Sequence, residues 1–317
     1  MIIPFILIIV GFASLIYGAN WLVNGASSLA KKHNVSDLII GLTIVSFGTS
    51  APELVVNSLA SYDGFSDIVF GNIIGSNNFN LFIVLGVTAL VYPIAVQPST
   101  AWKEIPISLF VTILLFAFAN NFFANQNTDI SRADGAIMLL AFLFFLYYLF
   151  LQVKKSKPEV IDYEPMSNFK IWGLIIIGLG GLMLGGKLVV DNGVDIATQL
   201  GVSQKIIGLT IIAAGTSLPE LVTSVVAAVK KNSDIAIGNI VGSNIFNILL
   251  ILPVSALIHP IEYNTDFNQD LLILIGGTAF LIIAMVLGKK KRIDRWEAVI
   301  LLGFYLFYSV RMVIQEL

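Results

Sequence analysis

Three features of the sequence predict an all-α integral membrane protein with ten transmembrane helices in two five-helix repeats of inverted topology: composition, apolar segments and an internal duplication. The chain has 317 residues, of which 57% are hydrophobic and 12% charged, and its mean hydropathy is +0.89. Soluble domains carry about 25% charged residues. A content half as large indicates a membrane protein.

Ten segments have the length and apolarity that a membrane-spanning helix requires, which is about 20 mostly apolar residues. They are residues 3–26, 37–61, 68–92, 105–124, 134–153, 171–197, 205–229, 235–258, 270–288 and 297–315. The first segment lacks the basic flank of a signal peptide and is longer than its apolar core. We therefore expect it to be retained as a helix.

The positively charged residues predict the orientation. Alternate connections hold fourteen Lys and Arg residues, and the opposite connections, together with both termini, hold three. Cytoplasmic loops carry the excess of positive charge, so we expect both termini outside. The Lys-, Pro- and Glu-containing stretch 154–170 then becomes a cytoplasmic linker between a first repeat, residues 1–153, and a second, residues 171–317.

The two halves repeat each other at an offset of 167 residues. Between residues 39–80 and 206–247, 25 of 42 positions are identical, and the matches include Asn, Ser, Pro and Glu as well as apolar residues. Because each half contains five helices, the second copy starts on the opposite side of the membrane. Inverted repeats are typical of secondary transporters, whose substrate site lies near the midplane where the halves meet.

The duplicated motif GTSxPE places one acidic residue in the middle of an apolar span in each half. Glu53 and Glu220 have no Lys or Arg in their own helices, and an unpaired carboxylate at this depth costs several kcal/mol. Pro52 and Pro219 remove a backbone donor and open the helix there. A bound cation explains both carboxylates, whereas protonated, purely structural glutamates are the alternative.

Hydroxyl and amide oxygens accompany each glutamate. Thr49, Ser50, Thr216 and Ser217 lie within one turn, and the motif GNxxGSNxFN supplies Asn72, Ser76 and Asn80 in the first half and Asn239, Ser243 and Asn247 in the second. Hard cations such as Na⁺ and Ca²⁺ prefer this all-oxygen set. Two carboxylates neutralise one Ca²⁺ or accommodate two or three Na⁺, which is the physical basis of an antiporter.

Other chemistry is poorly represented. There is no cysteine and only two histidines, which excludes thiolate sites and makes imidazole-dependent metal chemistry improbable. No basic patch indicates nucleic acid. The group Lys187, Asp191 and Asp195 has two interpretations. It is either an exposed, salt-bridged surface or an external mouth that attracts cations.

These motifs resemble the cation/calcium exchanger superfamily, in its sodium/calcium exchanger branch, over essentially the whole chain. The resemblance implies a non-enzymatic antiporter that exchanges about three Na⁺ for one Ca²⁺ by alternating access, without a cofactor, as a single chain in the lipid bilayer. It implies that the first helix of each half slides as a gate. The ligands that it implies are Glu53, Glu220, Thr49, Thr216, Ser50, Ser217, Ser76, Ser243, Asn80, Asn247 and the carbonyls of Ser46 and Ala213.

Two departures from the superfamily refine this expectation. Some relatives have Asp at the position of Asn247, and the potassium-requiring branch typically does, so we expect potassium independence. The second departure is that the sequence has no room for the large cytoplasmic regulatory domain of animal exchangers, so we do not expect regulation by Ca²⁺ through such a domain. The alternative function is a Ca²⁺/H⁺ exchanger of the same superfamily. A channel is not favoured because the sequence contains no filter motif, and an intramembrane enzyme is not favoured because the sequence contains no nucleophile–base pair.

Overall fold

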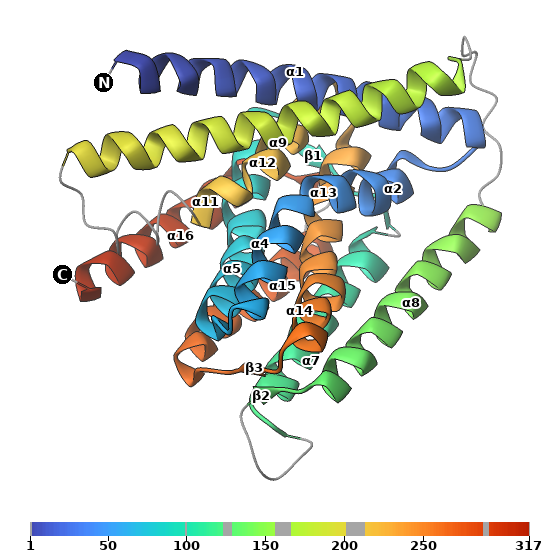
Figure 1. Ribbon diagram of the computed structural model, residues 1–317. Helices are drawn as coiled ribbons and strands as arrows, with labels where there is room; N and C mark the ends of the chain where they lie inside the picture. Colours follow the sequence, from blue (N-terminus) through green and yellow to red (C-terminus); the bar gives the residue numbers. More distant parts are fainter. Residues whose placement is uncertain are drawn as a thin grey trace.

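The computed structural model describes residues 2–98, 100–122, 129–155, 166–200, 213–287 and 292–316, and these are mostly helical (Figure 1). Seven of the described helices are long and apolar enough to cross a bilayer, or eight if a pair bent by 48° counts as one span. Parts of the sequence-based assignment lie outside the described residues: most of the 154–170 linker and the start of the 205–229 span.

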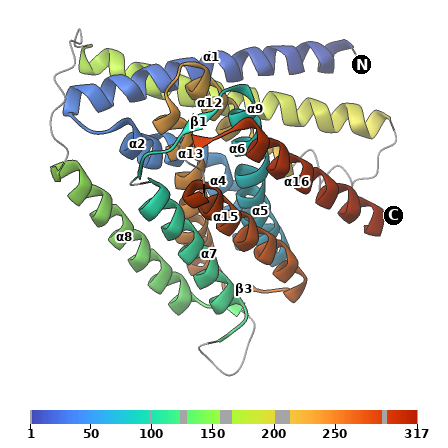
Figure 2. The ribbon, with the colours of Figure 1, turned by 180° about the vertical axis from the view of Figure 1, so that it is seen from behind.

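Two long helices lie antiparallel across one face of the bundle (Figures 1 and 2). They are α1 (Ile2–His33) and α9 (Asn168–Gln199), each of 32 residues and longer than the predicted segments. Glycines allow their backbones to touch. A Cβ on Gly18 would lie 2.8 Å from the Gly178 carbonyl oxygen, and one on Gly185 would lie 2.7 Å from the Gly11 carbonyl oxygen. Small residues permit this close approach in membrane helices.

The remaining helices of the first half pack among those of the second half. They are α2 (Asp37–Ile40), the π-helical η1 (Gly41–Val45), α3 (Ser46–Thr49), α4 (Ala51–Tyr62), α5 (Ser66–Asn78), the π-helical η2 (Phe79–Val84), α6 (Leu85–Val91), the π-helical η3 (Thr100–Glu104), α7 (Ile105–Ala119) and α8 (Arg132–Lys155). The second half repeats much of this order. Its described elements are α11 (Ala213–Thr216), α12 (Leu218–Val229), α13 (Ser233–Phe246), the π-helical η5 (Asn247–Ile251), α14 (Leu252–Ile258), the 3-10 helix η6 (Thr265–Phe267), α15 (Asn268–Leu287) and α16 (Arg295–Glu316).

Both copies of the GTSxPE motif break their helix at the serine. Ser50 separates α3 from α4 with φ −86° and ψ 9°, and Ser217 separates α11 from α12 with φ −91° and ψ 7°. The proline two residues later starts the new helix, where its missing N–H has no partner to lose. Each glutamate consequently lies in the first turn of a fresh helix.

Four strands of two residues each were not expected from the sequence. β1 (Ile94–Ala95) pairs antiparallel with β4 (Arg292–Ile293), and β2 (Asp129–Ile130) pairs antiparallel with β3 (Ile261–Glu262). Each strand pair joins a loop of the first half to a loop of the second half. Such short ladders leave no sequence periodicity, which is why the apolar pattern did not predict them.

The core is divided between the two long helices and the bundle. One apolar cluster joins α1 and α9 to the nearby ends of α12 and α13, and a larger one fills the space around α5, α13 and their neighbours. Every residue of α13 from Ile235 to Phe246 is buried, whereas α8 exposes large apolar side chains such as Leu143 and Phe144. The buried helices hold the polar motifs, and the exposed apolar helices suit a lipid environment.

Candidate ion site

The two helix breaks meet in the interior, and each glutamate is contacted by the serine of the opposite half. The Ser50 hydroxyl donates to Glu220 Oε1 at 2.8 Å, and the Ser217 hydroxyl donates to Glu53 Oε1 at 3.5 Å. The glutamates are 1% and 0% exposed. The two interactions correspond to each other under the 167-residue offset, so the duplication in the sequence becomes a pseudo-twofold arrangement in space.

Threonines and asparagines make a similar pair of contacts between the two halves. The Thr49 hydroxyl donates to Asn239 Oδ1 at 3.0 Å, and the Thr216 hydroxyl donates to Asn72 Oδ1 at 3.5 Å. We call Glu53, Thr216, Ser217, Asn72 and Ser76 the Glu53 cluster, and Glu220, Thr49, Ser50, Asn239 and Ser243 the Glu220 cluster. Each cluster therefore takes residues from both halves of the chain.

The two predicted serines of the GSN motifs are buried but bonded differently. Ser243 lies 2.9 Å from the Ser50 hydroxyl and 3.4 Å from Glu220 Oε1. Ser76 instead donates to Asn72 Oδ1 at 3.1 Å. Only the Glu220 cluster thus has its second serine against the carboxylate.

Several buried side-chain oxygens have no described hydrogen-bond partner, and four of them belong to the predicted ligands. These four are Glu53 Oε2, Glu220 Oε2, Asn80 Oδ1 and Asn247 Oδ1, which form two pairs related by the offset. Asn80 and Asn247 lie at or next to the start of the π-helical segments η2 and η5, and π-helical turns are frequent at functional sites. Because buried acceptors are normally satisfied, this arrangement suits a cation.

The two remaining predicted ligands differ in what the structure describes. The carbonyl oxygen of Ser46 accepts from the Thr49 hydroxyl at 3.3 Å and from the Ser50 amide at 3.0 Å. Ala213 is the first residue of α11, directly after residues that are not described.

Two asparagines that sequence reasoning did not assign lie on the pseudo-twofold axis. Asn77 Nδ2 donates to the Asn244 carbonyl, and Asn244 Nδ2 donates to the Asn77 carbonyl, both at 3.3 Å. Asn77 Oδ1 also accepts from Asn247 Nδ2 at 2.9 Å. The available signal was their separation of 167 residues, since residues so related can touch only at the axis.

The two clusters differ in their exposure. Thr49 and Asn239 are buried, whereas their counterparts Thr216 and Asn72 are partly exposed. Backbone packing closes the Glu220 cluster: a Cβ on Gly242 would lie 2.6 Å from the Ser46 hydroxyl oxygen. By the exposure of these residues, the Glu220 cluster is the more buried of the two.

The charge around the site comes from the two glutamates. Among the described residues, no group of three or more His, Cys, Asp or Glu could hold a metal ion, so a cation here would need neutral oxygens as well. The acidic group on α9 lies elsewhere: Lys187 and Asp191 form the exposed salt bridge that the sequence allowed, at 2.9 Å with side chains 73% and 58% exposed. That pair is a local surface feature.

Comparisons with known proteins identify the family of the chain. The family model described as "Sodium/calcium exchanger protein" matches residues 3–151 and 170–314. The putative antiporter CaxA of Alkalimonas amylolytica is 39% identical over 98% of both chains. The sodium/calcium exchanger MaX1 of Methanosarcina acetivorans is 31% identical over 96% of this chain and 97% of its own.

The fold is similar to that of a solved exchanger. A structure of the sodium-calcium exchanger NCX_Mj, soaked with zero Na⁺ and Ca²⁺, superimposes with a TM-score of 0.83 at 32% identity and covers 98% of this chain and 99% of its own. The chain therefore belongs to the sodium/calcium exchanger family of integral membrane cation antiporters, which are transporters and not enzymes.

Proposed function

We propose that this protein exchanges Na⁺ for Ca²⁺ across a prokaryotic inner membrane, with about three Na⁺ for each Ca²⁺ and without K⁺. The observation that carries the proposal is the pair of buried glutamates, each held by the serine of the opposite break and each with one carboxylate oxygen that has no described partner. Oxygen ligands of this kind and number suit Ca²⁺ and Na⁺.

In this proposal the ligand roles follow the two clusters. Glu53 and Glu220 bind Ca²⁺ centrally, assisted by Thr49 and Thr216. Flanking Na⁺ ions use these glutamates together with the serine hydroxyls and backbone carbonyls; the residues concerned are Ser50, Ser217, Ser76, Ser243, Ser46 and Ala213. Asn80 and Asn247 complete the centre. One Ca²⁺ and three Na⁺ compete for the same carboxylates, so the two loads exclude each other.

The amide at Asn247 supports the proposed independence from K⁺ and a weakened dependence on protons. It contributes a neutral oxygen and cannot exchange a proton, and its Nδ2 is already used in the bond to Asn77. With only two ionisable groups in the centre, binding of either load requires both glutamates to be ionised.

We further propose that ten spans in two inverted repeats, residues 1–153 and 171–317, perform alternating access with both termini outside. The strand pairings support this arrangement, because β1–β4 joins two connections of the Lys-rich set and β2–β3 joins two of the opposite set. The close backbone contact between α1 and α9 supports movement of these helices as one unit, since small residues let the two helices pack tightly against each other.

Liposomes that contain the purified protein and internal Na⁺ test the proposal. We expect Ca²⁺ uptake after dilution into Na⁺-free buffer, equal rates with and without K⁺, and none with Glu53→Gln. At three Na⁺ out for one Ca²⁺ in, one net positive charge leaves in each cycle, so an interior-positive potential should accelerate uptake.

Three results would contradict parts of the proposal. A rate unaffected by membrane potential would mean two Na⁺ per Ca²⁺. Uptake that requires K⁺ would remove the role given to Asn247. Uptake driven only by a pH gradient would establish the Ca²⁺/H⁺ alternative and show that the hydroxyl oxygens do not bind Na⁺.

A further inference from the structure

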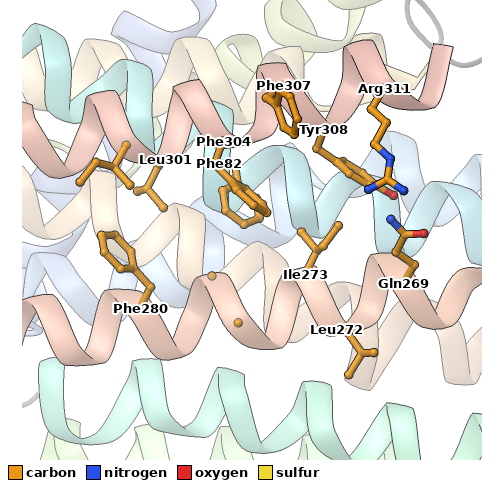
Figure 3. Close-up of a pocket in the computed structure, with 13 residues that line it drawn as sticks. Phe82, Gln269, Leu272, Ile273, Phe280, Leu301, Phe304, Phe307, Tyr308 and Arg311 are labelled. Carbon is orange, nitrogen blue, oxygen red and sulfur yellow. The ribbon is translucent and has the colours of Figure 1, made fainter. Parts of the chain in front are cut away.

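A long apolar groove is lined by residues that lie outside both glutamate clusters (Figure 3). It runs between α15 and α16, has a volume of about 740 Å³, and has Phe82 of η2 in its lining. Small-molecule sites in proteins typically measure about 300–1,000 Å³. The groove is thus large enough to hold a ligand.

Two adjacent glycines on α15 create the space. Phe82 lies directly against the backbone of Gly277, which has no room for a Cβ. Gly276 has no described atom within 4 Å of an added Cβ, although it lines the groove. The rims are apolar, with Phe304 and Leu272 about half exposed. The space is open to the surroundings of the protein and not to its core.

The depth of the groove matches one leaflet of a bilayer. Its lining on α15 extends from Gln269, at the helix start, to Phe280. Eleven residues at a helical rise of about 1.5 Å per residue span about 16 Å. Half of a hydrocarbon core about 30 Å thick is about 15 Å. The groove therefore runs from the membrane interface approximately to the midplane.

The interfacial end of the groove contains polar and charged side chains. Arg311 of α16 and Gln269 of α15 point toward each other there (Figure 3). Arg311 has no described hydrogen-bond or ion-pair partner. The nearby Tyr308 hydroxyl donates to Asp270 Oδ1 at 2.6 Å, and no ion pair between Asp270 and Arg311 is described. A guanidinium with free donors beside an amide is suited to a phosphate.

We propose that this groove binds a phospholipid, with one acyl chain along Gly276 and the phosphate at Arg311 and Gln269. The apolar length accounts for the chain, and the single cation at the interface accounts for the headgroup. Arginine at a helix end also extends to headgroups in general. A specific site differs from this by requiring the groove as well as the charge.

Native mass spectrometry of the delipidated, full-length protein tests the site. It would be titrated with phosphatidylglycerol and, separately, with a galactosyl diacylglycerol that has the same acyl chains but no phosphate. Gly276→Leu fills the groove, and Gly303→Leu is its matched control, because Gly303 is exposed on α16, lies outside the groove and is unobstructed. Arg311→Gln removes the charge.

We expect wild type and Gly303→Leu to retain phosphatidylglycerol about tenfold more strongly than the galactolipid, as a charge-assisted hydrogen bond predicts. Arg311→Gln should abolish that preference, and Gly276→Leu should weaken both lipids. Equal lipid retention by Gly276→Leu and wild type would overturn the proposal. So would a wild-type dimer that Gly276→Leu dissociates, because a second copy would then occupy the groove.

Discussion

The Glu53 and Glu220 clusters contain the same residue types, yet they differ in burial and in the distance between serine and carboxylate. In the Glu220 cluster the serine–carboxylate distance is 2.8 Å and Asn239 is fully buried. In the Glu53 cluster the distance is 3.5 Å and Asn72 is partly exposed. Chemically equivalent groups thus form one tight and one loose side of the same site.

The difference indicates how a duplicated motif serves a transporter. If inversion of the repeats relates two states of the molecule, each cluster is the tight one in one state and the loose one in the other. Closure then depends on helix packing against glycines such as Gly242, while the ligands stay the same. The following experiments, in decreasing order of expected effect, test whether the two sides differ in access or in chemistry.

Neutralising either glutamate should have the largest effect, and the two effects should be equal. Removal of one partner from a buried charged site costs about 3–5 kcal/mol, so Glu53→Gln and Glu220→Gln should each reduce Na⁺-driven Ca²⁺ uptake by about 100-fold or more. Glu104→Gln is the control, since Glu104 is also fully buried but is bonded to Tyr148 and Gln152 elsewhere. Substantial uptake by only one of the two variants would mean that its carboxylate belongs to a vestibule.

Thiol labelling should separate the two sides by access. The chain has no cysteine, so Thr216→Cys and Thr49→Cys each introduce a single, nearly isosteric thiol at equivalent positions. We expect the partly exposed position 216 to react with a membrane-impermeant reagent more than an order of magnitude faster than the buried position 49. Equal rates in ion-free detergent would show that both sides are open to the same degree.

The two serine–carboxylate bonds should differ in strength. A hydrogen bond to a charged group contributes about 1.5–3 kcal/mol, so Ser50→Ala should weaken Ca²⁺ binding by about tenfold or more. Ser217→Ala, which removes the longer bond, should have a smaller effect in the same titration calorimetry experiment. A larger loss with Ser217→Ala would reverse the assignment of the tight side.

Lys230 should give the smallest effect, because it is an exposed contact that holds α1 to the bundle. Its Nζ donates to the Asn20 carbonyl at 3.1 Å and to Asn24 Oδ1 at 2.8 Å. Exposed charged contacts contribute about 0.2–1 kcal/mol, so Lys230→Met should accelerate labelling of Thr49→Cys by about two- to fivefold. Lys231→Met changes the same charge without a described bond to α1, and an equal acceleration there would exclude this contact as a restraint.

Much of the fold and of the candidate site was accessible from the sequence. Composition predicted an integral membrane protein. The repeated GTSxPE and GNxxGSNxFN motifs predicted which polar residues lie in its interior. The positions of Pro52 and Pro219 predicted broken helices, and the structure breaks both two residues earlier, at Ser50 and Ser217. These features depend on local chemistry: proline has no N–H, and a buried carboxylate needs a partner.

Only the tertiary structure decided which groups meet and which side is closed. The pairing of Ser50 with Glu220 joins residues 170 positions apart, and the contact between Asn77 and Asn244 exists only at an axis between the halves. The phospholipid groove depends on Gly276, Gly277 and Phe82, which share no sequence motif. Two repeats with the same motifs cannot specify which cluster is the more buried. Beside the Glu220 cluster the structure shows why it is buried: α2, η1 and α3 pack against α13 with close backbone contact, which excludes solvent.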